Sequence, residues 1–121
     1  MIYNFLATKG VLSYNRPLAR YTWLKVGGAS EILFKPYNVD DLVHFITNLD
    51  RDINLTIIGA GSNLIIRDYG VEGVVIRLGK NFNNIKVINS HLIEVGASCL
   101  NINLAMFACE NQMGGLEFLS G

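Results

Sequence analysis

The sequence is poor in charge and in proline, and each shortage excludes a class of protein. Only 17% of the 121 residues are charged, and ten Lys and Arg balance ten Asp and Glu, so no basic excess indicates nucleic-acid binding. Two prolines leave no Pro-rich linker. An apolar share of 50% excludes intrinsic disorder, which requires few apolar side chains and a high net charge. The chain therefore suits one compact domain.

Cysteine is also scarce, and the pair Cys99 and Cys109 indicates free thiols. If the segment between them is helical, the two residues are separated by about 15 Å, which is beyond the reach of a disulfide. Neither cysteine has a CxxC or HxxH neighbour, so no metal site is expected. Two reduced, buried thiols fit a cytoplasmic protein.

Signals for export and for membrane insertion are missing as well. Residues 1–10 contain no cationic region ahead of an apolar core and no small-residue cleavage site. No run approaches about 18 uninterrupted apolar residues, so no membrane partner is expected. A formal charge of zero on so apolar a chain predicts that part of its surface is covered by another surface.

Hydrophobic periodicity predicts an α+β fold with an irregular leader at residues 1–20 and a domain at residues 21–121. A β-branched run at 55–58 is typical of a buried strand, and Asn38 is a suitable N-cap for a helix that ends near residue 50. We expect a βαββ unit with parallel strands across that helix, beside an antiparallel region. The predicted elements are strands at 30–35, 55–58, 64–67 and 73–78, an antiparallel hairpin at 85–88 and 92–95, and a second helix at 99–113 capped by Ser98.

Residues 59–63, Gly-Ala-Gly-Ser-Asn, carry the pattern most typical of ligand binding. Glycines allow backbone angles that are costly elsewhere, and successive N–H groups in such a turn can form an anion-binding nest for phosphate. Ser62 and Asn63 add side-chain donors. The dinucleotide fingerprint fails because position 64 is Leu where a third glycine is required, and a Walker loop is absent. A tight β-turn without a ligand remains the alternative on spacing alone.

Other polar residues carry weaker patterns. Arg67 and Arg77 flank the predicted sheet of the glycine-rich segment and could meet phosphate, although solvated strand arginines are commoner. Trp23 is expected in the core. The remaining candidates have no partner at a catalytic or metal-ligand spacing in the sequence: His44, His91, Ser98, Ser120, Glu94 and Glu117.

Four motifs follow one another along the chain: YTWLKVGG at 21–28, LTIIGAGSNLIIRD at 55–68, GVVIRL at 73–78 and GLEFLSG at 115–121. In this order they resemble the N-terminal part of the UDP-N-acetylenolpyruvoylglucosamine reductase family, in its shorter second type. The resemblance covers nearly all of the chain after residue 15. An apolar run that ends on Ser120-Gly121 further predicts a chain that is cut rather than finished.

The resemblance implies a flavoprotein of peptidoglycan synthesis, and so of cell wall biogenesis, cell shape and cell division. Its fold would be an incomplete FAD-binding domain of the type found in vanillyl-alcohol oxidase and p-cresol methylhydroxylase (PCMH). In the family, NADPH reduces the flavin, and the flavin passes hydride to the enolpyruvyl double bond of the UDP-sugar. The product is UDP-N-acetylmuramate.

The resemblance also implies the site residues. In the family, the loop that matches residues 59–63 wraps the FAD diphosphate, and the run that matches 116–121 leads into a second cofactor loop that is absent here. The implied cofactor-binding residues are Ile58, Gly59, Ala60, Gly61, Ser62, Asn63, Leu64, Ser120 and Gly121.

The family's catalytic residues all lie beyond the position of Gly121, so no catalytic residue is expected in this chain. We therefore expect the chain alone to be inactive and to bind FAD weakly or not at all. Apolar edges without a cover predict self-association. Two alternatives remain: a stand-alone nucleotide- or phosphate-binding module, and a structural domain without a ligand.

Overall fold

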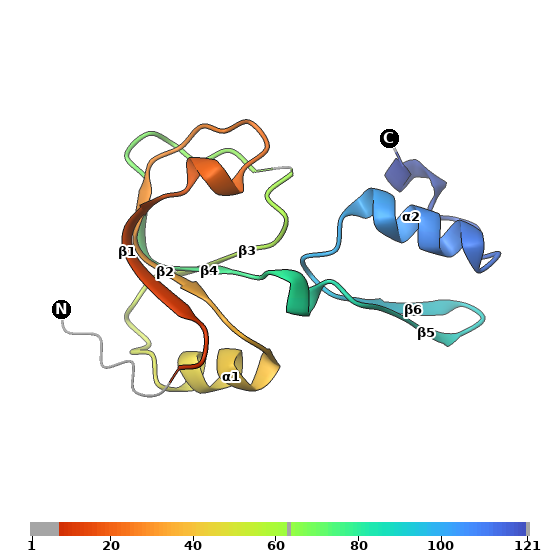
Figure 1. Cartoon of the computed structure of the whole chain (residues 1–121), viewed down its shortest axis with the longest axis horizontal. Helices are drawn as coiled ribbons and strands as arrows, with labels where there is room; N and C mark the ends of the chain where they lie inside the picture. Colours follow the sequence, from red (N-terminus) through yellow and green to blue (C-terminus); the bar gives the residue numbers. More distant parts are fainter. Residues whose placement is uncertain (1–7, 63, 121) are drawn as a thin grey trace.

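The computed structural model of the chain describes residues 8–62 and 64–120 (Figure 1). Asn63 and Gly121, both expected at the cofactor site, lie outside the described residues. The elements form a four-stranded sheet with one helix, followed by a hairpin with a second helix. They are β1 (Val11–Pro17), η1 (Ala19–Tyr21), β2 (Ala29–Lys35), α1 (Val39–Thr47), β3 (Leu55–Ile58), β4 (Val71–Arg77), η2 (Lys80–Phe82), β5 (Ile85–Asn89), β6 (Leu92–Val95), α2 (Asn101–Glu110) and η3 (Glu117–Ser120).

The four-stranded sheet has the strand order β1-β2-β4-β3. β1 is antiparallel to β2, whereas β2, β4 and β3 are mutually parallel. The expected parallel βαβ arrangement is therefore present, but β4 lies between the two strands that α1 connects. The carboxyl ends of the three parallel strands lie at the same edge of the sheet. Ile58, the last residue of β3, pairs with Arg77, the last residue of β4. Phe34 pairs with Ile76, and Lys35 is the last residue of β2.

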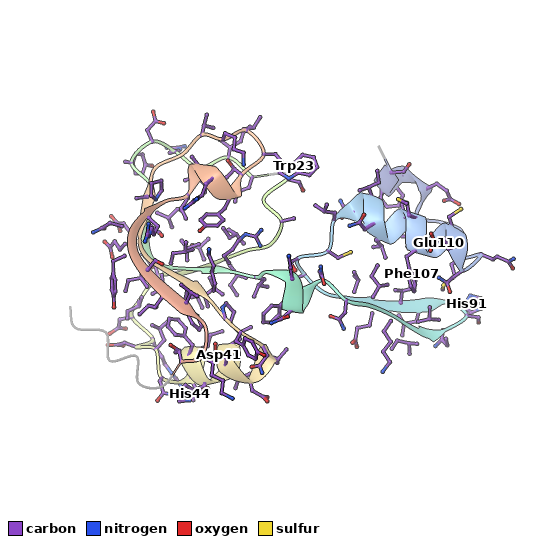
Figure 2. The ribbon with its side chains drawn as sticks, in the orientation of Figure 1. Trp23, Asp41, His44, His91, Phe107 and Glu110 are labelled. Atoms are coloured by element: carbon purple, nitrogen blue, oxygen red, sulfur yellow. The ribbon has the colours of Figure 1, made fainter. Side chains whose placement is uncertain are left out.

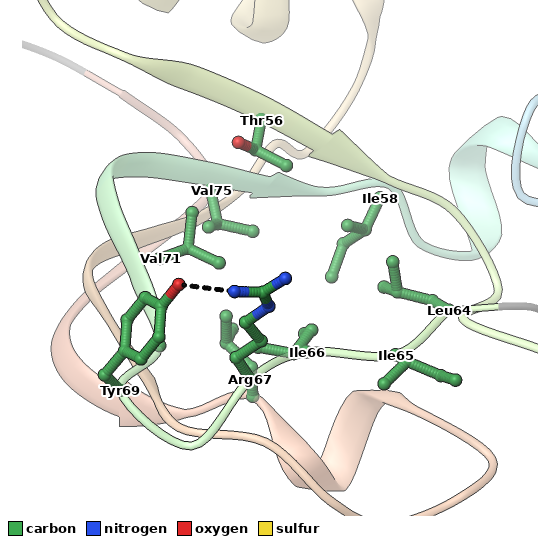
Figure 3. A pocket seen from close by; sticks show the side chains of 11 residues that line it. Thr56, Ile58, Leu64, Ile65, Ile66, Arg67, Tyr69, Val71 and Val75 are labelled. Atoms are coloured by element: carbon green, nitrogen blue, oxygen red, sulfur yellow. Dashed lines mark hydrogen bonds between the residues drawn. The ribbon is translucent and has the colours of Figure 1, made fainter.

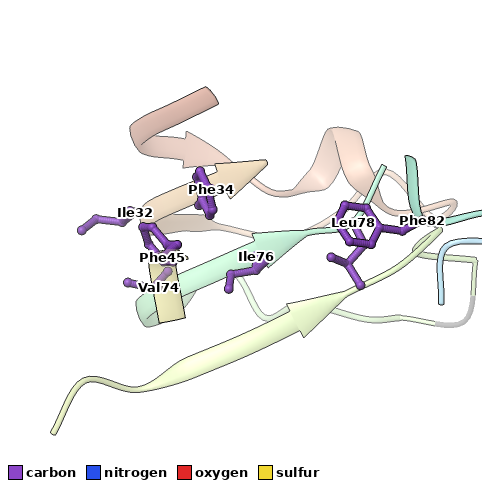
Figure 4. Packing of buried hydrophobic residues seen from close by; sticks show 7 residues of the cluster. All are labelled: Ile32, Phe34, Phe45, Val74, Ile76, Leu78 and Phe82. Carbon is purple, nitrogen blue, oxygen red and sulfur yellow. The ribbon is translucent and has the colours of Figure 1, made fainter. Parts of the chain in front are cut away.

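Both faces of the central strands are buried, because alternate side chains of β2 and β4 point to opposite faces. On one face, α1 covers the sheet, and the ring of Phe45 stacks on Phe34 with their centroids 4.1 Å apart (Figure 4). On the other face, Leu33 and Val75 pack with Leu18, which lies just before η1. Packing on both faces holds β2 and β4 in place, and the candidate site lies at the carboxyl end of the sheet that they form.

The N-terminal strand differs from the expectation of an irregular leader. Val11–Pro17 pairs along the whole of β2, from Lys35 back to Ala29. Its side chains are mostly exposed, since it is an edge strand, and so its sequence shows no clear apolar alternation. The prediction of a domain that starts at residue 21 remains a prediction.

Two further expectations for the sheet are wrong. β3 has the predicted bounds but is an edge strand, and Ile57 is 53% exposed, because β-branched residues favour strand geometry whether or not they are buried. Residues 64–67 form no strand, although Ile66 is buried. At the end of this segment the backbone enters a turn, in which the carbonyl of Arg67 accepts hydrogen bonds from the N–H groups of Gly28 and Gly70.

The expected helix starts fare differently. α1 begins after Asn38 as predicted, and the Asn38 side chain accepts a hydrogen bond from Asp41 N at 2.9 Å. α2 is shorter than expected, and Ser98 does not cap it: the Ser98 hydroxyl donates to the carbonyl of Gly79 at 2.6 Å. The antiparallel pairing of β5 with β6 is as predicted. Neither helix in the described part of the chain is long and apolar enough to cross a membrane.

Candidate functional site

The loop after β3, residues 59–62, lies at the carboxyl edge of the parallel strands and is held by two other segments. A Cβ at Gly61, whose φ is +72°, would collide with the carbonyl oxygen of Tyr21. A Cβ at Gly59 would lie 2.5 Å from the carbonyl oxygen of Ala97. The N–H of Trp23 also donates to the carbonyl of Gly61 at 3.2 Å. Both glycines are therefore required by close backbone approach.

The N–H groups of this loop are available to a ligand. Within residues 8–62 and 64–120, no backbone carbonyl accepts a hydrogen bond from the N–H groups of Gly59, Ala60, Gly61 or Ser62. Backbone N–H groups without an internal partner are the donors that an anion-binding loop requires. The loop can thus offer hydrogen bonds to a group that only accepts them, such as a phosphate.

Two open clefts flank the loop. One, of about 290 Å³, is lined by all four loop residues together with Ile58, Leu64 and residues 97, 99 and 101. The other, of about 370 Å³, is lined by Ala60, Arg77, Lys80 and Ser98 among others. Ala60 and Cys99 belong to both linings, so the two clefts adjoin one another.

The structure brings together most of the expected cofactor-binding residues. Ile58, Leu64 and the four described residues of the loop line one cleft. Ser120 is apart from them: it lies in η3, and its hydroxyl donates to the carbonyl of Glu117 at 2.7 Å. The expected roles of Asn63 and Gly121 fall outside the described residues.

An apolar pocket of about 210 Å³ adjoins the first cleft and shares Ile58 and Leu64 with it (Figure 3). Val71 and Val75 line it, and at its rim Arg67 Nη1 donates to the hydroxyl of Tyr69 at 3.3 Å. An apolar pocket next to unpaired donors suits a ligand that has both a flat ring and phosphate groups.

Three cations gather around the ring of Tyr21. Its centroid lies 4.8 Å from Lys35 Nζ, 5.9 Å from Arg77 Cζ and 6.0 Å from Arg20 Cζ. Burial lowers the pKa of the Arg77 guanidinium, and the neighbouring Tyr21 opposes this shift. Arginine keeps its charge through such shifts, so the cluster is cationic.

The cation cluster was largely missed at the level of sequence. Of the two arginines considered from the sequence, Arg77 is half-buried rather than solvated, whereas Arg67 is exposed as expected. Tyr21 and Lys35 have no local signal, since the ring of Tyr21 in η1 contacts Lys35 at the end of β2 and Arg77 at the end of β4. Because the pairing of β2 with β4 and the position of η1 bring them together, no spacing in the sequence could have found them.

Two other residues differ from their expected surroundings. Trp23 is 63% exposed and points away from the four-stranded sheet, so its predicted place in the core is wrong (Figure 2). Cys99 and Cys109 are both free, but Cys109 is exposed, contrary to the expectation of two buried thiols. His44 and His91 both lie on the surface. No group of three His, Cys, Asp or Glu side chains in the described part of the chain gathers to hold a metal ion.

The chain is similar to proteins of known name over most of its length. The sequence pattern of a family described as "FAD binding domain" matches residues 30–121. UDP-N-acetylenolpyruvoylglucosamine reductase of Rickettsia typhi is 52% identical over 113 residues, and that of Rickettsia prowazekii is 50% identical over 113 residues. Each of these matches covers 93% of the chain and 38% of the relative, so the chain spans well under half of the length of these relatives.

A solved structure agrees with these relatives. The crystal structure of UDP-N-acetylenolpyruvylglucosamine reductase from Thermus caldophilus superposes with a TM-score of 0.66 at 29% sequence identity. This match covers 95% of the chain and 38% of that structure.

Proposed function

The chain belongs to the FAD binding domain family, and from this we propose that it is the FAD-binding part of a UDP-N-acetylenolpyruvoylglucosamine reductase. The observation that carries the proposal is 52% identity to such a reductase across 93% of the chain. A stand-alone phosphate-binding module would give no reason for similarity of this extent to one enzyme.

The residues present fit this cofactor. A diphosphate only accepts hydrogen bonds, and the N–H groups of residues 59–62 have no partner among the described residues. Ile58 and Leu64 place apolar surface beside these donors. We propose that these six positions hold FAD, and that Asn63, Ser120 and Gly121 complete the contact.

When bound, FAD would supply hydride transfer from NADPH to the enolpyruvyl double bond of UDP-N-acetylglucosamine enolpyruvate, which is a step of peptidoglycan synthesis. The part of this chain is to bind and orient the cofactor. NADPH and the UDP-sugar are its further proposed partners, and the cytoplasm is its proposed location, in keeping with two free thiols.

The proton-transfer groups of the reaction are proposed to come from the rest of the reductase. Within the described residues, neither cleft beside the loop is lined by a carboxylate or a histidine, which are the commonest general acids. Of the two expected outcomes, weak or absent FAD binding, we propose weak binding for the chain alone, because the donor N–H groups of residues 59–62 are present, and we expect it to catalyse no reduction. Exposed apolar side chains such as Ile57 and Ile65 are proposed to be covered in the whole reductase, or by self-association of the chain alone.

A titration of the purified chain with FAD tests the proposal. Saturable quenching of flavin fluorescence, with a melting temperature that rises with FAD concentration, is the expected result. AMP, which lacks both flavin and diphosphate, serves as the comparison ligand. A melting temperature that FAD leaves unchanged would contradict the proposal.

A further inference from the structure

Positive charge is concentrated at the carboxyl edge of the parallel strands. Arg77 ends β4 and Lys35 ends β2, and Arg77 is paired with Ile58, directly before the glycine-containing loop. In open α/β sheets, ligands bind outside the carboxyl ends of the strands. The two cations are therefore placed where the sheet would receive a ligand.

The Arg77 side chain is fixed in position but is not fully paired. Its Nη1 donates to the carbonyl of Leu78, and its Cζ lies 5.9 Å from the ring centroid of Tyr21. Its Nε is buried and has no hydrogen-bond partner in the described part of the chain. A buried donor without an acceptor is costly, and arginines with a purely structural role are usually paired.

No acidic side chain within residues 8–62 and 64–120 balances the charge of Arg77, because no carboxylate contributes to its pKa shift, whereas the neighbouring Tyr21 does. Arg77, Lys35 and Arg20 all lie within 6.0 Å of the Tyr21 ring centroid, so three positive charges surround one ring. An anion beside them would be attracted by this charge.

The space for such an anion is the larger of the two clefts beside the loop. Arg77 and Lys80 line this cleft together with Ala60. Ala60 also belongs to residues 59–62, the donor loop of the site, whose backbone N–H groups have no partner among the described residues. One ligand can therefore contact both the loop and the arginine. Lys80 is exposed and adds a second positive charge to the same cleft.

From these contacts we infer that Arg77 is a phosphate-binding residue, with its guanidinium held by Tyr21 and paired with the diphosphate of a bound dinucleotide. Lys80 adds longer-range attraction from the exposed side of the cleft. This inference rests on the proposed function, since FAD is the dinucleotide. It adds one side chain, that of Arg77, to the backbone N–H groups of residues 59–62 that are proposed to bind the diphosphate. Arginine suits this role because its planar fork can donate two hydrogen bonds to phosphate.

The test compares Arg77→Met with Arg77→Lys and with Arg51→Met. Arg51 is an exposed residue in the turn after α1 and lines none of the clefts beside the loop, so Arg51→Met removes the same charge elsewhere. Three ligands are titrated: FAD, riboflavin, which has the flavin ring but no phosphate, and inorganic pyrophosphate, which has the diphosphate but no flavin or adenosine. Dissociation constants come from flavin fluorescence, and pyrophosphate binding is followed by the shift in melting temperature.

Arg77→Met is expected to weaken FAD binding about 10- to 100-fold and to abolish the pyrophosphate shift, which is the range for loss of a charge-assisted hydrogen bond. Riboflavin affinity should stay unchanged, Arg77→Lys should recover part of the loss, and Arg51→Met should match the unsubstituted chain. Equal binding of FAD by Arg77→Met and Arg51→Met would overturn the inference. So would an equal loss of riboflavin affinity, because that result indicates a purely structural arginine.

Lys80→Gln keeps the inference falsifiable if Arg77→Met does not fold, because Lys80 is exposed. This variant should weaken FAD binding less than 10-fold and reduce its dependence on salt, and an unchanged salt dependence would overturn the inference. The pyrophosphate titration distinguishes a failure of the proposed FAD binding from a failure of the inference about Arg77. A chain that binds pyrophosphate through Arg77 but does not bind FAD would contradict the proposed function and support the phosphate-binding role of Arg77.

Discussion

The carbonyl oxygen of Tyr21 occupies the position that a Cβ of Gly61 would need. One residue thus has two roles at the site, because the Tyr21 backbone fixes the donor loop while its ring contacts Arg77 and Lys35. Backbone and side-chain donors of the candidate site are therefore positioned by the same short segment after β1.

Gly61→Ala is expected to destabilise the chain by about 2 kcal/mol or more and to abolish FAD binding. The added methyl group collides with Tyr21, and the φ of +72° strains any L side chain. Urea unfolding and the FAD titration measure the two effects. Gly114→Ala is the control, since its Cβ would meet only Glu117 Oε1, at 3.6 Å. Equal stability of the two variants would contradict this explanation.

Tyr21→Leu is expected to weaken FAD binding severalfold, whereas Tyr21→Phe should bind nearly as well as the unsubstituted chain. The phenylalanine ring still offers its face to Arg77 and Lys35, and an aliphatic side chain does not. The FAD dissociation constant at low and at moderate salt is the readout. If both variants bind equally, the ring does not position the cations.

Asp41 connects the start of α1 to the chain before β1, and its substitution by Asn should destabilise the fold by about 1–3 kcal/mol. The carboxylate accepts hydrogen bonds from the N–H groups of Lys9, Gly10 and Tyr37 at 2.8–2.9 Å. Burial raises the pKa of Asp41, but these three hydrogen bonds and the charge of His44 outweigh it and lower the pKa below its ordinary value of 3.8.

The pH dependence of this contribution follows from the lowered pKa. An acid whose pKa is lower in the folded state stabilises the fold fully at pH values above its unfolded pKa, here 3.8, and loses that effect as the pH falls toward the folded value. The free energy of unfolding of the unsubstituted chain should therefore fall more steeply below about pH 4 than that of Asp41→Asn. Asp40→Asn, at an exposed neighbour, should keep the steep fall. Parallel pH profiles for the chain and for Asp41→Asn would contradict the prediction.

Phe45→Ala should cost about 3–5 kcal/mol, because it removes the ring that stacks on Phe34 between α1 and the sheet. Val43→Ala, on the exposed side of the same helix, should cost less than about 1 kcal/mol. Urea unfolding of both variants measures the difference. Similar losses would indicate that α1 is not packed through Phe45.

Locally encoded features could be predicted from the sequence. The helix after Asn38, the strand at 55–58 and the hairpin around residue 90 follow from capping, β-branching and alternation, each of which acts within a few residues. The donor loop at 59–62 was predicted for the same reason, since its glycines and its position after a strand are adjacent in the chain.

Features set by distant contacts could not be predicted. Val11–Pro17 becomes a strand because β2 offers it an edge, and its own side chains give little sign of this. Ser98 resembles a helix cap in sequence, but in the structure its hydroxyl donates a hydrogen bond to the carbonyl of Gly79 instead. The Arg77 cluster likewise depends on the pairing of strands that are far apart in the chain.

Proton–nitrogen NMR of the chain during titration with FAD tests the central claim most directly, because it observes each proposed donor separately. The largest shifts are expected at the backbone amides of residues 59–62 and at Nε of Arg77, with pyrophosphate reproducing the shifts at these same donors. Saturating FAD that moves amides elsewhere and leaves these donors unchanged would contradict the account.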